Sequence, residues 1–136
     1  MKANIYNYEG EGIKCVYDNG KWVVCLKNWK PNNDITEIKY LEVHHKTDEQ
    51  FILLNGKAIL LSATRENNKF NIDVIPMEPF KVYNIPQGIW FNTITQKDTK
   101  LAYIQDAGTT SENSEYCNMS EEELEFIKNE SWTYLK

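Results

Sequence analysis

The chain has 136 residues and a mass of 16.0 kDa, which suits one domain with a single hydrophobic core. It carries 20 acidic and 15 basic residues, for a net charge of −5, so we expect no basic face for nucleic acid. There are two histidines, His44 and His45, and three cysteines. These counts exclude zinc fingers, iron–sulfur clusters and any metal site built from three histidines of one chain.

The sequence predicts a cytoplasmic protein with no membrane partner. No apolar run approaches the roughly 18–20 residues that span a bilayer, and the first nine residues lack the apolar segment of a signal peptide. Cys15, Cys25 and Cys117 form no Cys-x-x-Cys pair. We therefore expect three reduced thiols.

Short apolar runs separated by turn signals predict an all-β fold. Asp18-Asn19-Gly20 separates residues 12–17 from residues 21–26, and Asn55-Gly56 separates residues 51–54 from residues 57–61. Further strands are expected at residues 35–44, 70–75, 80–85, 89–95 and 100–105. Many short strands at this spacing favour a sandwich or a barrel.

If Asn55-Gly56 is a two-residue hairpin turn, both faces of the hairpin are largely apolar. One face carries Phe51 and Leu60, and the other carries Ile52 and Ile59. A hairpin that is apolar on both faces is buried on both. The second face must then be covered by another sheet, by the N-terminal strands or by a partner subunit, and we expect part of it to form a homodimer interface.

A short C-terminal helix is predicted over residues 121–128. Ser120 as N-cap and Glu123 three residues later form a capping box. Leu124 and Ile127 would pack this helix on the body of the protein.

His45, Glu49 and Gly56 follow one another with gaps of three and six residues, and Pro86-x-Gly88 follows after a strand–turn–strand segment. This pattern resembles the cupin superfamily, whose first motif reads His-x-His, three or four residues, Glu, six residues, Gly, and whose second begins Pro-x-Gly. The resemblance implies an all-β jelly-roll barrel, here with a short C-terminal α-helix.

The resemblance covers roughly residues 35–106, the expected barrel core. It implies one cupin domain over the whole chain, with N-terminal strands in residues 1–34 and a tail and helix in residues 107–136. Residues 47–49 and 82–90 are similar to ureidoglycolate lyase-like cupins. If the protein is an enzyme, this narrower resemblance implies a small-molecule lyase or isomerase.

The metal site of the cupin pattern is incomplete in this chain. Val43 and Phe91 stand where the family has metal-binding histidines, and only His45 and Glu49 match ligand positions. Because stable catalytic metal sites use at least three protein ligands, we expect no metal and no cofactor. An alternative register, Glu42-x-His44 followed by Glu49, would supply two carboxylates and one imidazole for a weak metal site.

Strand alternation favours the first register. Leu41, Val43 and His45 share one face of the expected strand, and their apolar company suggests that His45 points into the barrel.

We expect a pocket for a small organic ligand such as a sugar, a carboxylic acid or a ureido compound. His45 and Glu49 are the candidate catalytic pair for proton transfer, because imidazole titrates near neutral pH. The candidate ligand-binding residues are His44, His45, Glu49, Tyr83, Trp90, Phe91 and Tyr103.

Three alternatives stay open at this point. In the first, His45 and Glu49 form a buried hydrogen bond without catalytic function. In the second, the protein is a metal-dependent cupin enzyme with an atypical site. In the third, it is a structural dimer module whose barrel is filled by side chains.

Overall fold

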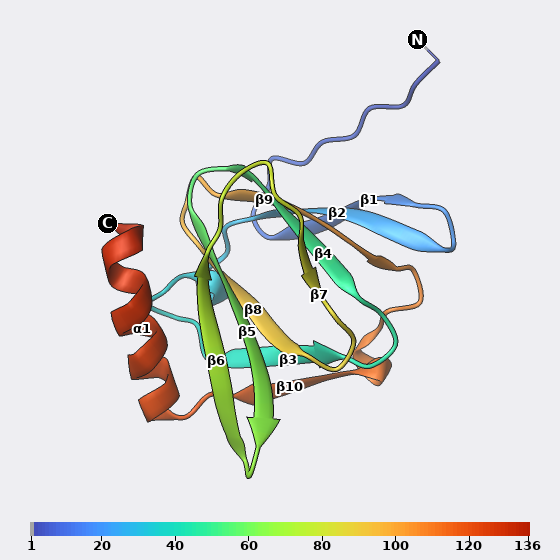
Figure 1. Ribbon diagram of the computed structural model, residues 1–136. Coiled ribbons are helices and arrows are strands. Elements are labelled where there is room, and N and C mark those ends of the chain that lie inside the picture. Colours follow the sequence, from blue (N-terminus) through green and yellow to red (C-terminus); the bar gives the residue numbers. More distant parts are fainter. Residues whose placement is uncertain (1) are drawn as a thin grey trace.

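A computed structural model describes residues 2–136, and within them ten strands form two antiparallel five-stranded sheets that face each other (Figure 1). Sheet A has the strand order β1 (Ile13–Asp18), β2 (Trp22–Asn28), β9 (Lys100–Asp106), β4 (Glu49–Asn55), β7 (Tyr83–Ile85). Sheet B has the order β10 (Ser114–Asn118), β3 (Tyr40–His44), β8 (Trp90–Thr95), β5 (Ala58–Glu66), β6 (Lys69–Pro76). The expected all-β jelly-roll class with a C-terminal helix is confirmed, although no strand pairing joins the two sheets into a closed barrel.

Three short helices complete the chain. Two are single 3-10 turns, η1 (Pro31–Asn33) and η2 (Ser111–Asn113), and the third is α1 (Glu121–Leu135). The predicted capping box is confirmed, since Ser120 and Glu123 exchange side-chain and backbone hydrogen bonds, and α1 runs seven residues beyond the predicted end at residue 128. None of the helices in residues 2–136 is long and apolar enough to cross a bilayer.

Two hydrophobic cores lie on the two sides of sheet B. The inner core fills the space between the sheets and includes Phe51, Leu60 and Phe91. The helix-side core lies between sheet B and α1 and includes Ile59 and Ile127, both fully buried. Strand β5 is therefore buried on both faces, and α1 rather than a partner subunit covers its second face.

The hairpin predicted around Asn55-Gly56 is wrong. Strand β4 belongs to sheet A and β5 to sheet B, so the two residues connect the sheets instead of turning within one. Asn55 donates a hydrogen bond to the backbone oxygen of Asp98 at 2.8 Å, and Gly56 has φ +73°. A Cβ atom on Gly56 would lie 3.1 Å from that oxygen. The short connection between the two sheets needs the same positive φ at Gly56 as a hairpin turn would. Asn55-Gly56 therefore indicated a turn correctly, but not that the two strands pair.

Most other predicted strands are confirmed, with three differences. Residues 35–37 form a turn, and the strand expected from residue 35 begins at Tyr40. The strand expected at residues 80–85 is only the three residues of β7. Strand β10 lies in the segment expected to be a tail, and it pairs with β3 so that Ser114 lies opposite His44.

The prediction of three reduced thiols is wrong for two of the cysteines. Cys15 and Cys25 lie opposite each other on β1 and β2 and form a disulfide, while Cys117 is free. Antiparallel register alone brought the two sulfur atoms together, and the sequence offers no Cys-x-x-Cys signal for such a cross-strand pair.

Candidate functional site

Strand β3 directs Glu42 and His44, not His45, toward the space between the sheets. Leu41 is fully buried in the helix-side core, so its strand face is the one that α1 covers. His45 follows the end of β3, has a side chain 46% exposed, and pairs with Glu115 on the surface. The inward orientation expected for His45 is therefore wrong. Its apolar neighbours indicated the helix-side core, because sheet B is packed on both faces.

A cavity of about 260 Å³ lies between the two sheets near one end of the sandwich. Sheet A contributes Lys27 and Tyr103, sheet B contributes Glu42 and His44, and residues 109–111 form part of the rim. Glu49, on β4, also lines this cavity and is 4% exposed. The cavity thus gathers both carboxylates and the histidine of the alternative register.

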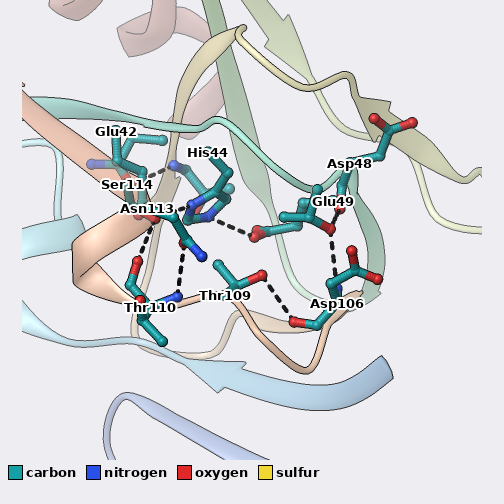
Figure 2. Close-up of polar contacts among 12 residues, drawn as sticks. Glu42, His44, Asp48, Glu49, Asp106, Thr109, Thr110, Asn113 and Ser114 are labelled. Carbon is teal, nitrogen blue, oxygen red and sulfur yellow. Dashed lines mark hydrogen bonds and ion pairs between the residues drawn. The ribbon is translucent and has the colours of Figure 1, made fainter. Parts of the chain in front are cut away.

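His44 is held in one orientation by Ser114, the first residue of β10 (Figure 2). Its Nδ1 lies 2.7 Å from Ser114 Oγ, and the Ser114 hydroxyl donates a hydrogen bond to the Thr110 carbonyl oxygen at 2.8 Å. Because the hydroxyl has a single proton, Ser114 accepts from His44, and Nδ1 carries a hydrogen. The other nitrogen, Nε2, is therefore the one free to exchange a proton in the cavity.

His44 Nε2 faces Glu49 Oε1 at 3.2 Å and Glu42 Oε2 at 3.8 Å. Burial alone would lower the pKa of His44, but the hydrogen bond to Glu49 and the charges of both glutamates outweigh burial and raise that pKa above its usual value. For the Glu49 carboxyl, burial has the opposite effect and raises the pKa. The hydrogen bond to His44 opposes this increase, and the charge of Glu42 adds to it. At 3.2 Å, Nε2 and Oε1 are close enough to hold one proton between them.

Lys27 is a buried cation on the opposite wall of the cavity. It extends from the inner face of β2, is 6% exposed, and no hydrogen bond or ion pair joins it to another residue of 2–136. Burial lowers the pKa of Lys27 to about 8, and the nearby charges of Glu42 and Glu49 only partly oppose this effect. Lys27 was not a predicted site residue.

Two further groups offer polar atoms to a ligand. Gln105 lines the cavity, and its side-chain oxygen is buried without a hydrogen-bond partner among the described residues. Burial and the charges of the two glutamates raise the pKa of Tyr103, so its phenol stays protonated at all ordinary pH values.

The structure separates the predicted aromatic residues. Tyr103 lines the cavity, and the Phe91 ring packs against the His44 ring at 5.3 Å, forming an apolar wall beside it. Trp90 packs edge-on against Phe70 toward the helix-side core, and the Tyr83 hydroxyl accepts a hydrogen bond from the backbone N–H of Glu78. The expectation that Trp90 and Tyr83 line the pocket is therefore wrong. Neighbouring residues of β8 point to opposite faces, so Phe91 faces inward and Trp90 outward. Tyr83, on β7, packs against the inner core outside the cavity.

The residues around His44 do not fit a metal ion. No group of three or more His, Cys, Asp and Glu side chains within residues 2–136 is arranged to hold one. Both nitrogens of His44 already have partners, Phe91 occupies the space beside the ring, and the Lys27 ammonium shares the same cavity and would repel a cation.

Sequence reasoning missed Lys27, Gln105 and Ser114. A weak signal for Lys27 was present, because it follows directly after the strand predicted at residues 21–26 and continues the alternation of Val23 and Cys25. No comparable signal marked Ser114, since its role depends on the pairing of β10 with β3.

We predict that replacing Lys27 with Met stabilises the protein at pH 7 by up to about 3 kcal/mol. The folded-state pKa of about 8 lies below the ordinary value of 10.5, so between these pH values the unfolded chain binds more protons and wild-type stability rises with pH. The advantage of Lys27→Met should therefore disappear by about pH 10.5. Urea unfolding from pH 7 to 10.5 measures it, with the exposed Lys14→Met as control. A pH-independent difference would contradict the prediction.

Comparison with protein families finds no family that matches this sequence, and comparison with curated proteins finds no relative. Solved structures do share the fold. Pac13, a nucleoside dehydratase from Streptomyces, is 9% identical with a TM-score of 0.54, covering 85% of this chain and 88% of its own. BH2720 from Bacillus halodurans is 19% identical with a TM-score of 0.57, covering 74% of this chain and 73% of its own.

A cupin-2 domain protein from Shewanella frigidimarina is also similar, with 18% identity and a TM-score of 0.50. That alignment covers 71% of this chain and 82% of the other. Identities this low establish the shape of the backbone and not the chemistry of the site. The cupin-type fold that the motifs implied is thereby confirmed.

Proposed function

We propose that the protein binds a small organic metabolite in the cavity between its sheets and moves a proton on it through His44 and Glu49. The observation that carries this proposal is the pair of Nε2 and Oε1 atoms 3.2 Å apart, which opens onto the cavity while Ser114 holds the far side of the imidazole. A pair that only satisfied buried polar groups would not need to open onto a cavity.

The reaction class that this geometry suits is a lyase or isomerase reaction without a metal. Such reactions remove a proton from carbon and return one to carbon or to a leaving group, so a pair that holds one proton near neutral pH can serve as both base and acid. Pac13, which shares the fold, is a nucleoside dehydratase, and loss of water is an elimination of this kind. The narrower resemblance to ureidoglycolate lyase-like cupins would extend the same chemistry to a ureido compound.

The catalytic assignment moves from His45 to His44. Glu49 keeps its proposed role as the partner carboxylate, and Tyr103 keeps its proposed role in ligand binding as a donor. Glu42 adds a second negative charge near the imidazole, which favours its protonated form.

We also propose that the chain forms a homodimer through the outer face of sheet A. Two large apolar side chains of this face are exposed, Trp22 at 45% and Leu54 at 51%. The N-terminal segment leaves the body as an extended arm (Figure 1), and its Tyr6 packs on Tyr17 of the same face. The N-terminal arm lies beside the exposed apolar side chains of sheet A, so it could pack on the same face of a second copy.

The cytoplasmic location is proposed from the sequence alone. The disulfide between Cys15 and Cys25 counts against it, because such bonds are rare in reducing compartments.

We predict that wild-type protein in D₂O exchanges or eliminates a carbon-bound proton of at least one compound in a panel of small sugars, carboxylic acids and ureido compounds, measured by proton NMR. His44→Gln should slow this reaction by at least about 100-fold, since general acid–base groups contribute factors of this order. His45→Gln is the matched control and should leave the rate unchanged, because His45 lies on the surface.

Equal losses in His44→Gln and His45→Gln, or no reaction of any compound with the wild type, would contradict the proposal. Activity that develops only after loading with Fe²⁺, Mn²⁺ or Zn²⁺ would instead favour the metal-dependent alternative.

We predict from the exposed face of sheet A that light scattering at tens of micromolar gives twice the chain mass of 16.0 kDa. Leu54→Glu should convert the protein to a monomer, because it places a charge in the interface. Phe126→Glu, at a residue 45% exposed on α1, is the control and should remain dimeric. A monomeric wild type would contradict this proposal.

A further inference from the structure

We infer that the ligand of the cavity is a small carboxylate, whose anionic group is bound by the ammonium of Lys27. The inference rests on the proposed function and names the substrate class of the same site.

Lys27 lacks a partner of opposite charge in the described part of the chain. A buried ammonium is costly unless an anion or several acceptors accompany it, and no such group of the described chain lies within ion-pair distance of Lys27. Its side chain lies between Ile13 on β1 and Leu101 on β9, which lie opposite it in sheet A, and it lines the cavity. A ligand anion in that cavity would pair with the ammonium, which has no ion-pair partner among residues 2–136.

The charged residues that line the cavity leave one positive charge unbalanced. Lys27 and Lys30 bring two positive charges and Glu42 brings one negative charge. The His44–Glu49 pair is neutral overall when it holds one proton between Nε2 and Oε1. One positive charge is left, so a ligand with a single negative charge neutralises the site.

The donors of the cavity suit a carboxylate better than a phosphate. Phosphate sites usually combine several donors, such as the N–H groups of a helix N-terminus or the fork of an arginine. This cavity offers one buried cation, Lys27, and Arg65, the single arginine of the chain, is not among its lining residues. A carboxylate, with one charge, matches such a site better than a phosphate dianion.

The placement also suits the proposed proton transfer. Lys27 lies on sheet A and His44 on sheet B, so a carboxylate held by Lys27 would direct the rest of the molecule toward the imidazole. The unpartnered oxygen of Gln105 can then accept a hydrogen bond from a hydroxyl or amide N–H of the same ligand. Hydroxy acids and ureido acids carry such donors next to their carboxylate.

The test measures binding of butyrate, 2-hydroxybutyrate and 2-oxobutyrate, each beside its primary amide, and of inorganic phosphate, by calorimetry and ligand-observed NMR. We expect at least one of these carboxylates to bind the wild type, with its amide at least tenfold weaker. Lys27→Met should weaken the carboxylate at least tenfold and leave the amide unchanged. Lys14→Met, which removes an outward-facing lysine of β1, is the matched control.

Urea unfolding of Lys27→Met at pH 7 is measured beside the binding, and a variant at least as stable as the wild type separates lost binding from misfolding. The inference is overturned if no carboxylate binds, if acid and amide bind equally, if Lys27→Met keeps the carboxylate affinity, or if phosphate binds more tightly through Lys27. Carboxylate binding through Lys27 without proton exchange would leave the anion site standing and refute the proposed reaction. Proton exchange that depends on His44 but not on Lys27 would support the proposed reaction and refute the anion site.

Discussion

The packing of sheet B on both of its faces is the constraint on which the rest of the structure depends. Helix α1 covers one face with the helix-side core, and sheet A covers the other with the inner core. Strands β5 and β8 of sheet B are therefore buried on both sides over much of their length, and charged residues that face inward from this sheet are exceptions. Glu42 and His44 are such exceptions on β3, and together with Glu49 from sheet A they define the site.

The site concentrates charges that are expensive to bury. Glu49 is 4% exposed and Lys27 is 6% exposed, and each has a pKa displaced by burial in the direction of its neutral form. Stability alone would favour apolar residues at these positions. Their cost is understandable if a ligand completes the arrangement, with the His44–Glu49 pair acting on it and Lys27 neutralising its charge. The proposed function and the carboxylate inference thus explain the same unfavourable burial.

Local patterns predicted the fold well and the site only in part. Turn signals, apolar runs and the capping box at Ser120 gave nearly all the strands and the start of the helix, because these features depend on neighbouring residues. The faces of β3 could not be read from alternation, since Leu41 faces α1 and is as buried as an inner-core residue. The contact of Ser114 with His44 and the inter-sheet crossing at Gly56 depend on residues far apart in sequence, so no local pattern revealed them.

The most direct test of the account is a pH titration of the two histidines by proton NMR, which their small number makes easy to assign. We predict that His44 titrates with a pKa above the ordinary value of 6.5, and that Glu49→Gln lowers it, because the variant removes the hydrogen-bonding carboxylate while burial remains. A His44 pKa at or below 6.5 in the wild type, or one that Glu49→Gln leaves unchanged, would contradict the claim that His44 and Glu49 share a proton in the cavity.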